Sequence, residues 1–138
     1  MSPDERNLEF VCWIRVDADI TLAVHRILKT LSSHGVERDL AQMIATAASE
    51  LCRNIIRYAS YGSLSLHLQK QQDSQDCWLV AEDVGPGIHN VADAMTDGYS
   101  TGGFLGLGLP GVARMMDEVV VCPDYDAGAR ILARKRVG

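Results

Sequence analysis

The chain has 138 residues, of which 47% are hydrophobic, so we expect a single folded domain over residues 1–138 and exclude a disordered chain. The formal net charge is −5 and no basic block alternates with aromatic residues, which argues against a nucleic-acid partner. The first ten residues are polar and acidic where a signal peptide would be apolar, and no apolar run could span a bilayer. We therefore expect a cytoplasmic protein with no membrane partner.

The cysteines are few and widely spaced. Cys12, Cys52, Cys77 and Cys122 form no CxxC pair and have no companion histidine at a metal-binding spacing. The pattern predicts free cysteines that serve as small buried hydrophobes in a reducing compartment.

The first third of the chain predicts one strand and two helices. Residues 8–16 are rich in apolar and β-prone side chains, which is typical of a strand. Asp17 or Asp19 is a candidate cap for a following helix, which Gly35 ends. Residues 37–59 then carry a longer helical pattern with one apolar side.

Two strands and a glycine-rich stretch come next. Residues 64–68 alternate between leucine and polar side chains, and residues 77–84 form the continuous run of a central strand. Residues 85–108 hold more than half of the glycines and favour little regular structure, apart from a candidate helix over 91–97.

The end of the chain predicts a helix and a closing hairpin. Pro110 suits the first turn of a helix that residues 112–118 continue. Residues 119–122 and 129–133 predict two paired strands, and the basic residues 134–136 are interpreted as a solvated end. This order of elements predicts an α/β two-layer sandwich, with a mixed, mostly antiparallel sheet and helices on one face.

Three polar side chains interrupt the small and apolar face of the long helix. Glu50 and Asn54 lie one turn apart on the same side, and Arg57 falls near the same stripe. An amide oxygen is a hard ligand suited to Mg²⁺, and a neighbouring carboxylate can take a proton from an attacking hydroxyl. The alternative interpretation is a solvent-exposed polar pair, which short motifs often produce by chance.

A second candidate element stands where the central strand gives way to a loop. Asp83 can accept a hydrogen bond from the exocyclic amine of adenine, while Gly85 and Gly87 let the backbone approach the base. Glu82 should lie on the opposite face of the strand, because side chains alternate. Taken alone, Asp83 is equally compatible with a residue that caps a turn.

The third element is the run STGGFLGLGLPG at residues 100–111. Glycines before a helix leave backbone N–H groups that can hold phosphate, and their freedom suits a mobile lid. The alternative is a flexible connector.

Together these stretches resemble a known family. SELCRNIIRYA looks like the N box, EDVGPGI like the G1 box and GFLGLGLPGV like the G2 box of the GHKL superfamily of ATPases and kinases, which has the Bergerat ATP-binding fold. Within that superfamily, DGYST before the G2 box and MMDE after it are similar to the RsbT-type switch kinases of bacterial stress-response partner switching. The resemblance covers roughly residues 10–135.

The resemblance implies a role for each matching residue. Glu50 would be the general base, Asn54 the magnesium ligand and Arg57 a phosphate contact, with ATP and Mg²⁺ bound together. Asp83 would bind adenine in a pocket shaped by Gly85 and Gly87. The lid and phosphate loop would be formed by Thr101, Gly102, Gly103, Gly106, Leu107 and Gly108.

The resemblance also implies a protein partner. Such kinases phosphorylate serine or threonine on a STAS-domain antagonist or scaffold protein, signal to a downstream phosphatase or other effector, and are compatible with a homo-oligomer. Autophosphorylation on histidine is disfavoured, because we find no room for an upstream phosphoacceptor helix pair. Two alternatives stay open: an anti-sigma factor of the same superfamily, and a non-catalytic nucleotide-dependent binding module.

Overall fold

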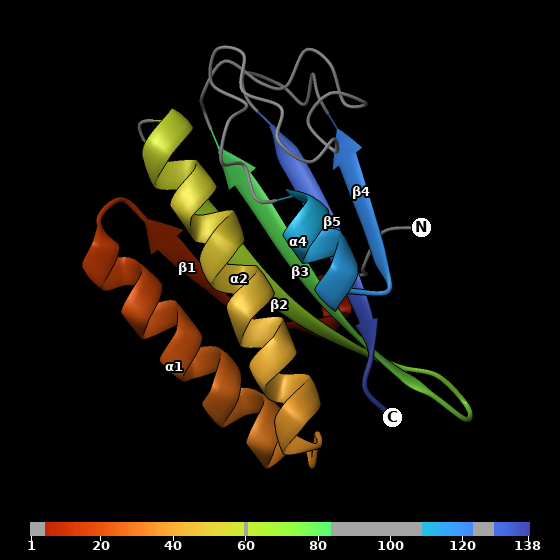
Figure 1. The fold of residues 1–138 in the computed structure, drawn as a ribbon. Coiled ribbons are helices and arrows are strands. Elements are labelled where there is room, and N and C mark those ends of the chain that lie inside the picture. The colour runs from red at the N-terminus through yellow and green to blue at the C-terminus, as the bar shows by residue number, and fades with distance from the viewer. Residues whose placement is uncertain (1–4, 60, 84–108, 123–128) are drawn as a thin grey trace.

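The computed structural model describes residues 5–59, 61–83, 109–122 and 129–138, which build a five-stranded sheet with helices on one face (Figure 1). Helix α2 lies between α1 and α4 in the helical layer. The elements in chain order are η1 (Glu5–Asn7), β1 (Leu8–Ile14), α1 (Asp17–Ser33), α2 (Arg38–Tyr58), β2 (Gly62–Lys70), β3 (Gln75–Asp83), α4 (Leu109–Met115), β4 (Glu118–Cys122) and β5 (Arg130–Arg136).

The sheet has the strand order β1-β2-β3-β5-β4, and each of these four pairings is antiparallel. The two-layer α/β architecture is confirmed. The sequence predicted a mixed, mostly antiparallel sheet, and over the described strands every pairing is antiparallel. The register places Ile14, Gly62 and Asp83 side by side at one end of β1, β2 and β3.

The ends of α1 are set by local hydrogen bonds. Val16, and not Asp17 or Asp19, occupies the N-cap position. Asp19 instead accepts hydrogen bonds at Oδ2 from the backbone N–H groups of Arg15 and Val16, at 2.9 and 3.1 Å, and these bonds lower its pKa. At the other end Gly35 has a φ of +76°, the left-handed conformation that glycine adopts most easily, so the predicted stop is confirmed.

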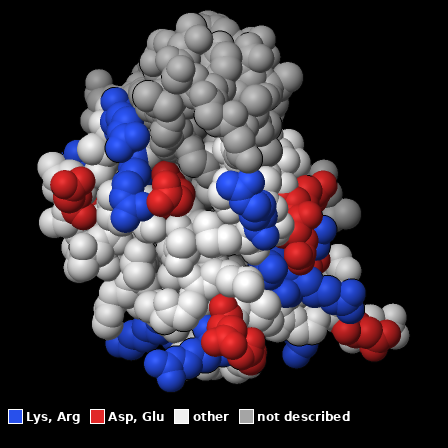
Figure 2. Space-filling view, in the orientation of Figure 1, with Lys and Arg blue, Asp and Glu red and all other residues white. Residues whose placement is uncertain are grey.

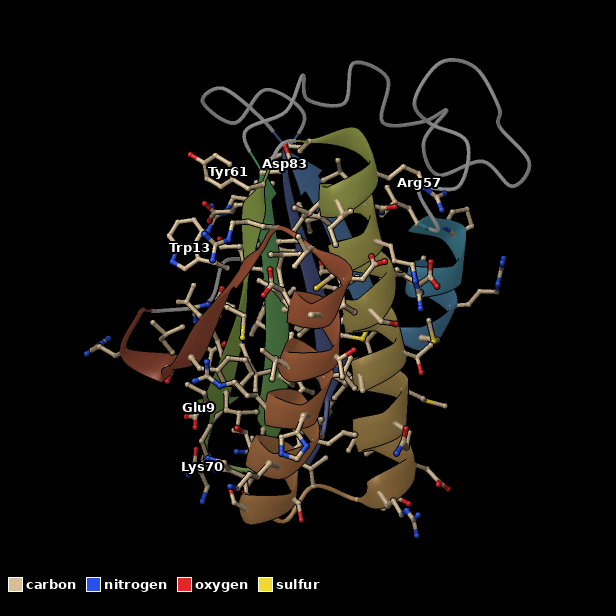
Figure 3. All side chains as sticks on the ribbon, turned by 90° about the vertical axis from the view of Figure 1, so that its left-hand side faces the viewer. Glu9, Trp13, Arg57, Tyr61, Lys70 and Asp83 are labelled. Carbon is tan, nitrogen blue, oxygen red and sulfur yellow. The ribbon has the colours of Figure 1, made fainter. Side chains whose placement is uncertain are left out.

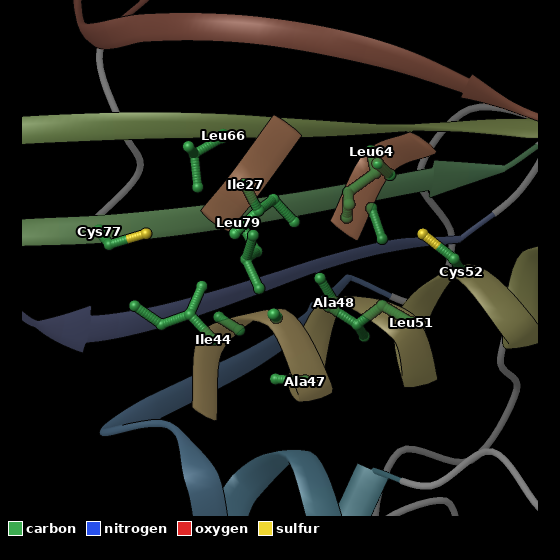
Figure 4. Packing of buried hydrophobic residues seen from close by; sticks show 14 of the residues in the cluster. Ile27, Ile44, Ala47, Ala48, Leu51, Cys52, Leu64, Leu66, Cys77 and Leu79 are labelled. Atoms are coloured by element: carbon green, nitrogen blue, oxygen red, sulfur yellow. The ribbon is translucent and has the colours of Figure 1, made fainter. Parts of the chain in front are cut away.

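Helix α2 supplies much of the core. Its alanines keep the helix close to the sheet, while its larger apolar side chains fill the space against the strands (Figure 4). Full burial of an isoleucine or leucine contributes about 1.5–3 kcal/mol. The facing residues include Ile44, Ala48 and Leu51 of α2 and Leu64, Leu66 and Leu79 of the sheet.

All four cysteines are free, as predicted, and three of them are buried. Burial raises the pKa of Cys52 to about 12 and that of Cys77 further still, so both thiols stay protonated at neutral pH.

The basic residues near the C-terminus are part of the sheet, which corrects their interpretation as a solvated end. Strand β5 runs to Arg136, past the predicted end at 133. Arg134 bridges Asp76 of β3 at 3.4 Å and Glu118 of β4 at 3.3 Å. Burial acts against the charged form, but these two carboxylates still raise the pKa of Arg134. The cluster therefore ties the three neighbouring strands together.

Helix α4 begins at Leu109 with Pro110 in its first turn, as predicted, and ends at Met115, before the predicted end at 118. No described helix has both the length and the apolar character needed to cross a membrane. The predicted helix over 91–97 lies outside the described residues.

Candidate functional site

Three elements meet at one end of the molecule. Helix α2 and strand β3 both end there, and α4 begins there. Figure 3 shows Arg57 of α2 and Asp83 of β3 directed toward this same end. Two of the predicted stretches, far apart in sequence, are thus brought to one edge of the fold.

On α2 the predicted polar stripe runs from the surface into the core. The side chain of Glu50 is 35% exposed, whereas Asn54, one turn later, is only 6% exposed. Arg57 is exposed again. Buried amides are uncommon and need bonding partners, so the burial of Asn54 sets it apart from the more exposed polar residues on the same helix. A hard oxygen donor in this position fits a magnesium ion, and the half-exposed carboxylate beside it fits a proton acceptor.

Asp83 is held at the end of β3 by the chain segment that leads into β5. Its N–H donates to the carbonyl oxygen of Ala129 at 3.0 Å, and its Oδ1 accepts from the N–H of Ala129 at 3.1 Å. Glu82 lies on the opposite face of the sheet, where its Oε1 is 3.3 Å from Nε of Arg130. The predicted separation of the two carboxylates is observed, and only Asp83 belongs to the helix side.

Gly62 is a positioning residue that none of the sequence motifs includes. It stands opposite Asp83 in the β2–β3 ladder. A Cβ at this position would collide with the carbonyl oxygen of Glu82 and lie 2.9 Å from Cγ2 of Ile55 and 3.1 Å from Cα of Asp83. The missing side chain therefore lets the end of α2 and the end of β3 approach closely.

We expect Gly62→Ala to destabilise the protein by about 1–3 kcal/mol, because backbone atoms must move to admit the methyl group. Urea unfolding measures this loss. Gly111→Ala in α4 is the matched control: its Cβ meets nothing within 4 Å, so its effect should be neutral or slightly stabilising. Equal stability of the two variants would contradict the close approach at Gly62.

Arg53 was missed in the sequence analysis. Its Nη1 donates to Oε1 of Glu50 at 2.7 Å across one turn of α2. The spacing of three residues predicts that Glu50 and Arg53 are neighbours on a helix. A basic residue at that spacing is ordinary on any helix surface, so the spacing alone does not indicate a role for Arg53.

The remaining predicted site residues lie outside the described part of the chain, so the phosphate loop and the glycines of the adenine pocket stay predictions. They are Gly85, Gly87, Thr101, Gly102, Gly103, Gly106, Leu107 and Gly108.

Comparison with known proteins shows the family and the fold. A family model described as a histidine kinase-like ATPase domain matches residues 15–135. The serine/threonine-protein kinase RsbT of Bacillus subtilis strain 168 is 44% identical over 92 residues, which cover 67% of this chain and 69% of that protein. The crystal structure of the SiaB–SiaC complex from Pseudomonas aeruginosa contains a similar fold, with a TM-score of 0.64 and 14% identity over 95% of this chain and 91% of that chain.

Proposed function

Because the chain belongs to the histidine kinase-like ATPase domain family, we propose that it is an ATP-dependent serine/threonine protein kinase of a bacterial partner-switching pathway. Its substrate is a hydroxyl group on a STAS-domain protein of the cytosol, and phosphorylation changes which partner it holds. The observation that carries the proposal is the pairing on α2 of a half-exposed Glu50 with a buried Asn54, on a chain 44% identical to a named kinase.

Glu50 and Asp83 have different tasks in this reaction. The hydroxyl oxygen of the partner attacks the γ-phosphorus of ATP, and the bond to the β,γ-bridging oxygen breaks, so that ADP leaves with the electron pair. Glu50 accepts the hydroxyl proton, and Asp83 accepts the hydrogen bond of the adenine amine.

Asn54 would hold a magnesium ion through its amide oxygen. The bound ion would offset the negative charge of the phosphates, which is the usual contribution of Mg²⁺ in phosphoryl transfer. The buried position of Asn54 suits this task, because a fixed ligand loses little freedom on binding.

Phosphorylation also explains the exchange of partners. A phosphoserine or phosphothreonine adds a charge of about −1.5 to −2 at pH 7. That charge would be repelled by Glu50, Asp83 and the phosphates of the nucleotide, so the product should leave. We expect the phosphorylated partner to bind at least about tenfold more weakly than the unphosphorylated one, which is 1.4 kcal/mol.

The test offers the purified protein a STAS-domain protein and a sigma factor in one mixture with ATP and Mg²⁺. We expect phosphate on a serine or threonine of the STAS-domain protein, measured by mass spectrometry, and weaker binding afterwards, measured by calorimetry. Stable capture of the sigma factor without transfer would overturn the kinase proposal and favour an anti-sigma factor.

A further inference from the structure

A groove runs beside the candidate site, between the start of α1 and the last turns of α2. Its volume is about 570 Å³, and it combines basic, acidic and apolar side chains. The lining residues are Asp17, Ile20, Thr21, Arg53, Ile56 and Arg57. Figure 2 shows basic and acidic side chains close together at the upper end of α2. The lining carries two arginines against one aspartate, together with two isoleucines, and this excess of positive charge suits an acidic protein segment.

Arg53 joins this groove to the proposed base. Its side chain is 52% exposed and lines the groove, yet the same guanidinium binds Oε1 of Glu50 at 2.7 Å. This bond directs Oε1 at Arg53 and fixes the orientation of the Glu50 carboxylate, which must turn if it is to present an oxygen to a hydroxyl group elsewhere. The pair thus holds Glu50 in a resting arrangement.

This arrangement is easily reversed. An ion pair between exposed side chains contributes little net stability, because water solvates both partners well when they separate. A guanidinium has five N–H donors, so an incoming carboxylate can bind Arg53 with the bidentate geometry that a single 2.7 Å bond to Glu50 leaves open.

We propose that Arg53 is a substrate-sensing residue: an acidic side chain of the protein substrate, docked in the α1–α2 groove, binds Arg53 and releases Glu50 to act as the base. This inference rests on the proposed kinase function and names where the substrate docks. Arg53 is then a positioning residue, because it acts through Glu50. When no partner is bound, the Arg53–Glu50 pair suppresses ATP hydrolysis.

The test compares Arg53→Ala with wild type and with Arg38→Ala, which removes an exposed arginine at the opposite end of α2. We expect Arg53→Ala to raise KM for the STAS-domain protein about tenfold, the loss typical of an interfacial arginine. The affinity for ATP should stay unchanged, and ATP hydrolysis without partner should rise. Arg38→Ala should match wild type in all three measurements.

A double-mutant cycle locates the acidic contact. Each acidic residue near the phosphorylated hydroxyl of the partner is changed to alanine, and one of these changes should lose its effect in the Arg53→Ala background. Arg53→Lys keeps the charge without the planar fork and should recover only part of the affinity.

The outcomes separate this inference from the proposed function. A wild-type protein that phosphorylates no STAS-domain protein overturns both. If wild type transfers phosphate but Arg53→Ala has an unchanged KM, or hydrolyses ATP more slowly without partner, only the sensing role is overturned. A loss of ATP affinity in Arg53→Ala would identify Arg53 as a phosphate contact and also overturn it.

Discussion

Replacement of Glu50 by glutamine is expected to slow phosphoryl transfer to the protein partner by a factor on the order of 10² to 10⁴, the usual contribution of a positioned base. The amide cannot accept the hydroxyl proton, but it has nearly the same shape and keeps a hydrogen-bonding oxygen for Arg53. ATP binding should therefore persist. Single-turnover transfer of labelled phosphate measures the rate, and a thermal shift with ATP measures binding.

The surface position of Glu50 means that Glu50→Gln should affect catalysis without affecting folding. Glu50 is 35% exposed and its described contact is the surface pair with Arg53, so the fold should tolerate the change. Arg53→Ala, assayed with the partner well above its raised KM, serves as the control, because it breaks the same pair and leaves the carboxylate. An unchanged transfer rate in Glu50→Gln would reduce Glu50 to a polar neighbour and favour the non-catalytic binding module.

Local patterns predicted the elements of this fold well. The helical spacing over 37–59 matches α2, and the continuous run predicted at residues 77–84 matches the buried strand β3, which spans Gln75–Asp83. The hydrophobic side chains within each segment alone are enough to predict its type. Such patterns do not predict the strand order, because the insertion of β5 between β3 and β4 depends on pairs of residues that are 48 to 60 positions apart.

The candidate site was predicted only as far as its motifs extend. Glu50, Asn54 and Asp83 belong to short sequence patterns; Asp83 ends β3, Asn54 lies in the last turns of α2, and Glu50 lies one turn before Asn54. Gly62 was missed as a positioning residue, because its role arises from the carbonyl oxygen of Glu82, which comes near only after β2 and β3 pair. The basic residues at 134–136 were misinterpreted for the same reason, since their carboxylate partners lie on other strands.

Replacement of Asp83 by asparagine is expected to weaken ATP binding by about 10- to 150-fold, the equivalent of the 1.5–3 kcal/mol that a hydrogen bond to a charged group contributes. Asp83 Oδ1 already accepts a hydrogen bond from Ala129 at 3.1 Å, so an asparagine should keep its oxygen there and turn its NH₂ group toward the base. Two donors, the NH₂ group and the adenine amine, would then face each other.

Thermal unfolding with added nucleotide measures this effect. A ligand at 100 times its Kd stabilises a folded protein by about 2.7 kcal/mol, and a 100-fold weaker Kd would leave about 0.4 kcal/mol at the same concentration. GTP should be less affected, because guanine presents a carbonyl oxygen where adenine has its amine, and the new NH₂ group can donate to it. The preference for ATP over GTP should therefore shrink together with the affinity.

Glu82→Gln provides the matched control for Asp83→Asn. It makes the same chemical change one residue earlier, on the opposite face of the sheet, where Glu82 pairs with Arg130. That variant should keep both the ATP affinity and the preference over GTP, because its side chain cannot reach the helix side of the sheet. If wild-type protein is stabilised equally by ATP and GTP, or if both variants lose the preference alike, Asp83 does not recognise adenine.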